Sequence, residues 1–281
     1  MLLLKRNDSG DGVAMLQELL NENGATLIVN GVFDAPTEMA VSQFQLDNNL
    51  VSDGKVYTKT WTRLINSSKA DLKAMDKKFM KESDLQQMAD GLGVELAAIK
   101  AVNEVESGGR GFLVTGLPKI LFEGHIFWRQ LVQRGIDPLT RVAGNENVLY
   151  KKWTKKFYVG GKAEWDRLNK AINATLPGDN SETIKNITEA AYASASYGCF
   201  QIMGYHYSSL GYNEIIKFLA DMKFSEGRQL LVLGKFLKAN NMVDDLKNRR
   251  WASFALKYNG AGYKENQYDK KLAAAYKKYA P

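Results

Sequence analysis

The hydrophobic positions along the chain recur mostly with the period of an α-helix. Near the N-terminus, Val13, Leu16, Leu19 and Leu20 fall on one helical face. From about residue 72 onward, further segments show the same periodicity, with glycines and short polar stretches between them and few signs of strands. The pattern therefore predicts a mainly α protein, with a small helical domain at the N-terminus and a larger, predominantly helical domain after it.

Residues 1–66 contain an internal repeat. The segments NGVFDAPT (30–37) and DGKVYTKT (53–60) each begin with an Asn/Asp-Gly pair typical of tight turns, and each has a threonine six residues after the glycine. A helix is expected after each turn; Asp34 caps the first of them, and Pro36 lies in its first turn, where a missing N–H costs nothing. Together with the helix around Leu16, this predicts a three-helix domain.

The polar stretch that follows, residues 67–78, contains few large apolar residues and is expected to be a linker. The domain limits predicted from the sequence are thus 1–66, 67–78 and 79–281.

Charge is distributed unevenly. The whole chain carries +7, but residues 1–66 hold five Lys/Arg against eight Asp/Glu, which leaves −3 there and +10 in the remainder. A basic C-terminal part suits an anionic polymer such as nucleic acid, a membrane surface or a cell wall, although a merely solvated basic face explains the charge equally well.

Few residues are available for redox or metal chemistry. The only cysteine, Cys199, excludes an intramolecular disulfide and a multi-cysteine zinc site, and two histidines make a histidine-rich metal site a poor interpretation. We therefore expect neither a metal nor a cofactor. The apolar run MLLL at the N-terminus is too short for a secretory signal, so we expect synthesis in the cytoplasm without an export signal of the chain's own.

The segment VELAAIKAVNEVES (94–107) places a carboxyl group on the apolar face of a helix. Glu106 follows Val102 by four residues and Ile99 by seven, so it shares their face. Gly108 and Gly109 are expected to end the helix, as glycine does after a C-cap. Apolar neighbours and the negative end of the helix dipole both disfavour the charged carboxylate, which predicts a raised pKa for Glu106.

The neighbouring carboxylate, Glu104, lies about 160° away from Glu106 around an α-helix. It follows Lys100 by four residues, so we expect an exposed ion pair between these two side chains and no catalytic pair of glutamates. A carboxylic acid kept protonated near neutral pH is what a glycosidase needs as its general acid. The alternative is a helix-terminal Glu106 bound by Arg110.

Residues 4–65 resemble the peptidoglycan-binding module of enzymes that degrade cell walls. The matching segments are SGDGVAMLQELL, NGVFDAPTEMAVSQFQ and LVSDGKVYTKTWTRL. Asp34 and Tyr57 stand where that family usually has glycine, which puts the muropeptide preference in doubt but not the fold. The alternative is a three-helix adaptor of unknown ligand.

The dipeptide ES at 106–107 resembles the helix end of the lysozyme-like superfamily, in particular goose-type lysozymes and lytic transglycosylases. There the glutamate donates a proton to the glycosidic oxygen, which implies that role for Glu106. SYGCFQIM (196–203) resembles the segment that lines the sugar cleft, and ALKYNG (255–260) the Tyr-Asn pair that faces the acid. The resemblance implies that Gln201, Tyr258 and Asn259 bind the substrate by hydrogen bonds to the glycan or orient the acid. Ser107 either binds substrate or merely ends the helix.

A closer resemblance is to the N-acetylmuramidase domain of bacteriophage endolysins. It is carried by VESGGRGF, KILFEGHIFW, ASYGCFQIMGYHYSSLGY and WASFALKYNGAGYKENQYDKKLAAAY. It implies a lysozyme-like catalytic domain that cleaves between N-acetylmuramic acid and N-acetylglucosamine, acting on peptidoglycan in host lysis. Such enzymes wait in the host cytoplasm until a partner opens the inner membrane, and then act in the periplasm.

Within LFEGHIFW, Glu123 and His125 are polar residues in an otherwise apolar stretch. Glu123 is either a base that positions water, because an inverting hydrolase needs a second carboxylate about 6.5–9.5 Å from its acid, or half of a structural pair with His125. His125 is counted among the substrate-binding candidates. Cys199 is expected to be a core residue and not a nucleophile, since no histidine lies near it in sequence.

The cluster YKKWTKKFYVGGK (150–162) mixes lysines with aromatic residues. Nucleic acid binds such stretches, but beside the other motifs the anionic cell wall or lipopolysaccharide of the outer membrane is the better partner. We expect a monomer that binds peptidoglycan and no nucleic acid. Three functions remain open: a hydrolytic muramidase, a lytic transglycosylase with the same acid, and a wall-binding or virion protein without activity.

Overall fold

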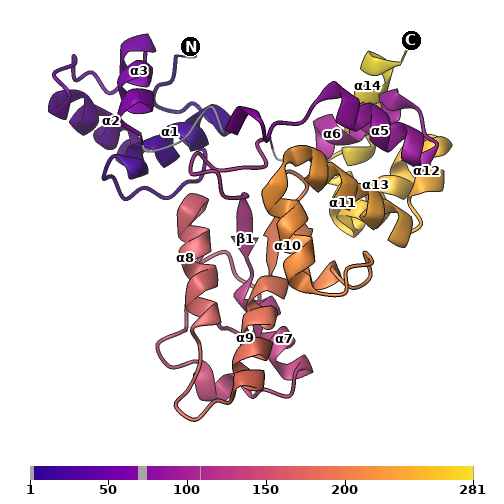
Figure 1. The fold of residues 1–281 in the computed structure, drawn as a ribbon. Helices are drawn as coiled ribbons and strands as arrows, with labels where there is room; N and C mark the ends of the chain where they lie inside the picture. Colours follow the sequence, from indigo (N-terminus) through magenta and orange to yellow (C-terminus); the bar gives the residue numbers. More distant parts are fainter. Residues whose placement is uncertain (1–2, 69–74, 108, 281) are drawn as a thin grey trace. The chain divides into compact units, whose positions relative to one another are not determined.

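The computed structural model describes residues 3–68, 75–107 and 109–280. It is mainly helical, as predicted, and also contains one small sheet; its backbone contacts divide it into two compact units (Figure 1). Unit 1 contains residues 1–76 and 112–196, and unit 2 contains residues 77–111 and 197–281. No helix in the described ranges is long and apolar enough to cross a membrane.

Unit 1 begins with three helices that correspond to the predicted N-terminal domain. Its elements are α1 (Asp11–Glu22), α2 (Ala35–Asp47), α3 (Thr58–Ser67), β1 (Ile120–Phe122), α7 (Gly124–Gln133), the 3-10 helix η1 (Pro138–Arg141), α8 (Gly161–Ile172) and α9 (Ser181–Ala193). The strand β2 (Ala195–Tyr197) carries the chain from unit 1 into unit 2, and the strand order of the sheet is β1-β2-β3, in which β3 is Ile202–Met203. These short strands lie in a part of the chain whose sequence shows few signs of strands.

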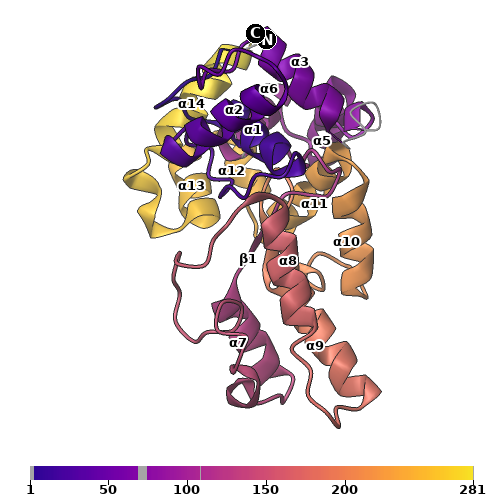
Figure 2. The same ribbon diagram turned by 90° about the vertical axis from the view of Figure 1, so that its left-hand side faces the viewer.

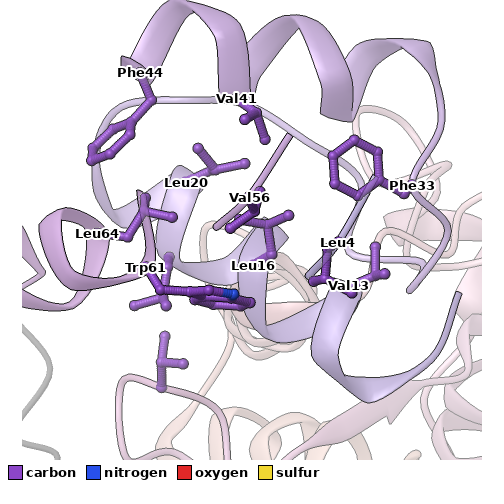
Figure 3. Close-up of a cluster of buried hydrophobic side chains, with 12 residues drawn as sticks. Leu4, Val13, Leu16, Leu20, Phe33, Val41, Phe44, Val56, Trp61 and Leu64 are labelled. Carbon is purple, nitrogen blue, oxygen red and sulfur yellow. The ribbon is translucent and has the colours of Figure 1, made fainter. Parts of the chain in front are cut away.

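A compact apolar cluster holds the three N-terminal helices together (Figure 3). Leu16 and Leu20 of α1 lie among side chains from α2 and α3, including Val41 and Leu64, and all four are at most 1% exposed. The helical spacing read in the sequence is thus the buried face of α1. Val114, which is remote in sequence, belongs to the same cluster.

Two buried glutamines explain the sequence repeat. Gln17 of α1 accepts a hydrogen bond from the Gly31 N–H (2.9 Å) and donates to Thr37 Oγ1 (3.0 Å). Gln45 of α2 repeats this arrangement in the second turn, accepting from the Gly54 N–H (3.0 Å) and donating to the hydroxyl of Thr60 (3.2 Å). Each Asx-Gly turn and the threonine six residues later are therefore held by one glutamine of a preceding helix.

The two departures from the usual glycines are accommodated by the backbone. Asp34 has φ −90° and caps α2 by accepting from the Thr37 N–H, as the sequence predicts, and Tyr57 has φ −103° at the start of α3. Neither angle lies in the left-handed region that favours glycine. The fold of the three helices therefore does not need glycine at either position.

The three N-terminal helices pack against later residues of unit 1. The Val114 N–H donates to Glu18 Oε2 (2.8 Å), and the Val29 N–H donates to the Val159 carbonyl (3.0 Å). The two compact units therefore do not coincide with the domains 1–66 and 79–281 expected from the sequence. Those domain limits stay a prediction. Residues 69–74 of the predicted linker lie outside the described residues.

Helices α7, α8 and α9 form a second group within unit 1, in which α9 contacts both others and α8 lies against β1 (Figure 1 and Figure 2). The side chain of Glu164 in α8 is fully buried, and its Oε2 accepts from the Phe122 N–H (3.1 Å) and from Arg167 Nη1 (2.7 Å). The same guanidinium donates to the Phe122 carbonyl (3.0 Å). This buried pair holds the end of β1 in place.

Unit 2 is a bundle of short helices. Its elements are α5 (Glu82–Leu92), α6 (Leu96–Glu106), β3 (Ile202–Met203), the 3-10 helix η2 (Gly204–His206), α10 (Ile215–Phe224), α11 (Glu226–Ala239), α12 (Val243–Lys247), α13 (Trp251–Asn259), the 3-10 helix η3 (Ala261–Lys264) and α14 (Tyr268–Tyr279). Helix α6 packs chiefly against α14 and α5, and α14 also packs against α13. Gly93 ends α5 in the left-handed conformation (φ 62°).

Replacing Gln45 tests the role of the repeated glutamines. Gln45→Leu preserves volume but removes the side chain that makes five hydrogen bonds, of which those to Thr60 and from the Gly54 N–H are buried. Because each such loss costs about 1–3 kcal/mol and neighbouring losses are partly shared, we expect a destabilisation of about 2–4 kcal/mol in urea unfolding. The exposed Gln43→Leu on the same helix is the control, expected within about 0.5 kcal/mol of wild type. Equal stability of the two variants would refute this role.

Candidate active site

Glu106 is the last residue of α6. Ser107 follows as the C-cap in an extended conformation (φ −75°, ψ 126°), and its N–H donates to the Asn103 carbonyl (3.1 Å). Gly108, one of the two glycines predicted to end the helix, lies outside the described residues, and Gly109 is left-handed (φ 79°). The predicted placement of Glu106 in the last helical turn is confirmed.

The carboxyl group of Glu106 is half-buried and has one amide partner. Asn259 Nδ2, at the end of α13, donates to Glu106 Oε1 (3.0 Å). Burial raises the pKa of Glu106 above its ordinary value of 4.5, and this outweighs the lowering by the Asn259 hydrogen bond and by the charge of Lys271. The raised pKa predicted from the sequence is confirmed, and desolvation is its cause.

Glu104 has a different environment from Glu106, but its predicted partner is wrong. It is exposed, and its Oε2 accepts from Lys278 Nζ (2.8 Å) and Tyr279 Oη (2.5 Å) of α14. Lys100 pairs instead with Glu82 of α5 (2.5 Å). The i,i+4 spacing permits a pair within α6, but the neighbouring helices offer each side chain a partner, and these contacts lower the pKa of Glu104.

Tyr258 lies next to Asn259 on α13 and packs between aromatic rings. Its ring stacks on Phe254 (centroids 5.6 Å apart) and meets Phe236 edge-on (6.0 Å). Burial, and then the charge of Glu106, raise the pKa of Tyr258. Its hydroxyl therefore keeps its proton at neutral pH and can donate a hydrogen bond.

Gln201 occupies a turn of unusual backbone geometry. It has φ 48° without being a glycine, and its Nε2 donates to the Gly198 carbonyl (2.8 Å). Cys199, 2% exposed, is a core residue as predicted, and its N–H donates to Gln229 Oε1 (2.8 Å). A Cβ at Gly198 (φ 74°) would lie 2.4 Å from the Gln229 side chain, so this turn requires glycine.

Gln229 and Glu226 of α11 hold the segments around the site in place. Neither residue was identified from the sequence. Gln229, 0% exposed, binds Cys199 in the turn, and Glu226 accepts from the Gly111 N–H (2.7 Å) and the Met80 N–H (2.9 Å). Glu226 thus fixes the chain shortly after Glu106. The only sequence signal is a pair of polar residues three apart at the start of an apolar helix, which resembles an ordinary first turn.

Glu123 and His125 belong to unit 1, whereas Glu106, Ser107, Gln201, Tyr258 and Asn259 belong to unit 2. Both polar side chains are 14% exposed. Tyr158 Oη donates to Glu123 Oε1 (2.6 Å), and His125 Nδ1 lies 3.3 Å from Glu123 Oε2. Burial, aided by the charge of Arg129, lowers the pKa of His125 despite the neighbouring carboxylate, so the imidazole is neutral at neutral pH.

The two units therefore hold two kinds of carboxyl group. Glu106 is desolvated with a single amide donor, which favours a proton donor. Glu123 accepts a hydrogen bond from the Tyr158 phenol on one oxygen and lies beside His125 on the other. Among the described residues, no group of three or more His, Cys, Asp or Glu side chains is arranged to hold a metal ion. The roles of the individual residues remain predictions.

Comparisons with known proteins agree with these observations. The family model described as N-acetylmuramidase matches residues 95–280, and the one described as a putative peptidoglycan-binding domain matches residues 9–64. Among solved structures, the crystal structure of Burkholderia AP3 phage endolysin is similar at 36% sequence identity and a TM-score of 0.64, covering 99% of each chain. No curated protein sequence gives a significant match.

The geometry at the end of α6 predicts that Glu106 is essential and Glu104 is not. Glu106→Gln keeps the Asn259 hydrogen bond, because the amide oxygen still accepts, but it has no acid proton to donate. We expect cleavage of purified peptidoglycan, followed by turbidity, to fall by at least about 10²–10⁴-fold. Glu104→Gln is the matched control and should keep most activity. An inactive Glu104 variant beside an active Glu106 variant would contradict this assignment.

The same substitution should stabilise the fold in a pH-dependent way. The pKa of Glu106 is higher in the folded than in the unfolded chain, so ionisation favours unfolding as pH rises from below 4.5 through the folded value. Glutamine does not titrate. Glu106→Gln should therefore match wild type in Tm at about pH 3 and exceed it at pH 7. A lower Tm for the variant at pH 7 only would show that the carboxylate is stabilising and the pKa is not raised.

Proposed function

This chain belongs to the N-acetylmuramidase family and carries a peptidoglycan-binding domain ahead of it, and we propose that it is a phage-type endolysin whose acid is Glu106. The reaction is hydrolysis of the bond between N-acetylmuramic acid and N-acetylglucosamine in host peptidoglycan. The desolvated carboxyl group at the end of α6, with its raised pKa, is the observation that carries the assignment.

Glu106 acts as the general acid in this proposal. Asn259 donates to Oε1, so the proton of the neutral carboxyl group is placed on Oε2. As the bond between the anomeric carbon and the glycosidic oxygen breaks, that proton passes to the leaving oxygen. The charge left on Glu106 is then stabilised by the Asn259 amide and by Lys271, the two groups that favour its ionised form.

Glu123 is the proposed second carboxylate. It takes a proton from the water whose oxygen attacks the anomeric carbon, which gives inversion and a free reducing muramic acid. Its support is geometric: Tyr158 donates to Oε1, and Oε2 lies beside the neutral His125. A merely structural Glu123–His125 pair is the competing interpretation.

The other functions considered are less well supported. A lytic transglycosylase would use the same acid but close an anhydro ring with the sugar's own hydroxyl, whereas the matching family is named for N-acetylmuramidase activity. A wall-binding protein without activity has no need of the desolvated acid or of the Asn259 contact. Hydrolysis is therefore the function that we propose.

Two measurements test the mechanism together. Wild-type protein should release fragments that end in reducing muramic acid, which borohydride converts to the alcohol and mass spectrometry detects. Glu123→Gln should lose at least about 10²-fold in activity with its fold intact, because the amide does not accept a proton from water.

The transglycosylase outcome is distinct. Anhydro ends are lighter by one water and inert to borohydride. Finding them together with an active Glu123→Gln variant would move the protein to that class and make Glu123 structural.

Cellular context completes the proposal. The protein waits in the host cytoplasm until the inner membrane is permeabilised and then reaches the periplasm, as a monomer. Its basic catalytic part, in a chain with net charge +7, also suits anionic lipopolysaccharide of the outer membrane. Cell fractionation before and after permeabilisation, sedimentation, and binding to lipopolysaccharide vesicles test these three statements separately.

A further inference from the structure

A strongly cationic loop in unit 1 has no role in the chemistry described above. The cationic loop is defined as residues 151–157, and it contains four exposed lysines, Lys151, Lys152, Lys155 and Lys156. The sequence contains no acidic residue between Glu146 and Glu164. None of the four lysines has an ion-pair partner among the described residues, so their charge is available to a ligand.

An exposed indole lies between these charges. Trp153 is 58% exposed, with Lys155 Nζ 5.8 Å from its ring centroid, and Lys156 Nζ lies 5.4 Å from the centroid of Phe157. An indole left in water presents a flat apolar face of the kind that covers the C–H face of a sugar ring. The flanking ammonium groups suit carboxylates on the same polymer.

The loop is tied to the proposed second carboxylate. Tyr158, the residue that directly follows the cationic loop, donates its hydroxyl hydrogen to Glu123 Oε1 (2.6 Å). At the other end, the ring of Tyr150 stacks with His125 (centroids 6.5 Å apart, 22° between planes) and also packs against Phe157 (5.2 Å). Both ends of the loop are therefore held next to the Glu123–His125 pair, through Tyr158 and Tyr150.

We propose that the cationic loop is a subsite for the glycan strand, with Trp153 beneath a sugar ring and the lysines on the carboxylates of the stem peptides. The inference rests on the proposed function, because peptidoglycan carries such a peptide on its muramic acid residues. The attachment of the loop to Glu123 favours this strand over lipopolysaccharide or nucleic acid. The glycan strand must lie near that carboxylate to be cleaved, whereas binding of the phosphates of the other two polymers does not require it.

The test separates charge from sugar contacts. The quadruple Lys→Gln variant of the cationic loop is compared with a control that removes four exposed lysines elsewhere, at positions 185, 217, 247 and 277. The substrate is soluble glycan strand, either with its peptide carboxylates or with those groups converted to amides. Because exposed pairs are individually weak, only the four together are expected to raise KM about tenfold on the carboxylate strand.

Three results are expected to accompany that increase. The loop variant loses much of the salt dependence of kcat/KM, its KM on the amidated strand changes less than about twofold, and the control variant matches wild type on both. Trp153→Ala raises KM on both strands, and Trp153→Phe has a KM between those of Trp153→Ala and wild type. Circular dichroism melts check that every variant is folded.

An unchanged KM and salt slope for the loop variant would overturn the inference. An equal increase in KM on the carboxylate and the amidated strand would also overturn it. If the loop variant cleaved both strands like wild type but no longer bound lipopolysaccharide vesicles or duplex DNA, the loop would be assigned to those polymers. Failure of the proposed function appears elsewhere, as anhydro product ends or an active Glu123→Gln variant, and leaves the KM comparison valid.

Discussion

Unit 2 is organised around a carboxyl group that must be kept largely out of water at the end of a helix. Burial disfavours the charged form of Glu106, and the negative end of the α6 dipole adds to this. Such a group destabilises the folded chain near neutral pH, so the surroundings must be fixed by other interactions. Packing of α6 against α14 and α5 fixes the helix, and Glu226 holds the chain at Gly111 soon after it.

The pKa values of the two glutamates near the end of α6 are shifted in opposite directions. Asn259 supplies one hydrogen bond, which moderates the raised pKa without cancelling it, and Tyr258 is neutral beside it. Two residues earlier, Glu104 binds Lys278 and Tyr279 and has a lowered pKa. Two glutamates of one helix thus differ in acidity because one is desolvated and the other is satisfied by charge and hydrogen bonds in water.

Local patterns in the sequence predicted what depends on local chemistry. The Asp34 cap, the apolar face of α1 and the desolvation of Glu106 follow from spacing along a single helix, and all are confirmed. The repeated threonines were visible as a pattern, but their cause, the buried glutamines at 17 and 45, depends on contacts between elements. A polar residue on a helix reads as exposed unless its partners are known.

The same limit explains the errors and omissions. The pair of Glu104 with Lys100 was wrong because helices distant in sequence compete for both side chains. Glu164 and Arg167, three residues apart, have the spacing of an ordinary exposed ion pair on a helix, yet they are buried against β1. Gln229 is likewise recognisable only once the turn at Gly198 is folded over it.

The acidity of Glu106 can be measured directly by an NMR titration of the protein with 13C-labelled glutamate carboxyl groups, assigned with Glu106→Gln and Glu104→Gln variants. Glu106 should titrate above the ordinary value of 4.5 and Glu104 below it. A Glu106 carboxyl that titrates at or below 4.5 would contradict a desolvated proton donor at the end of α6.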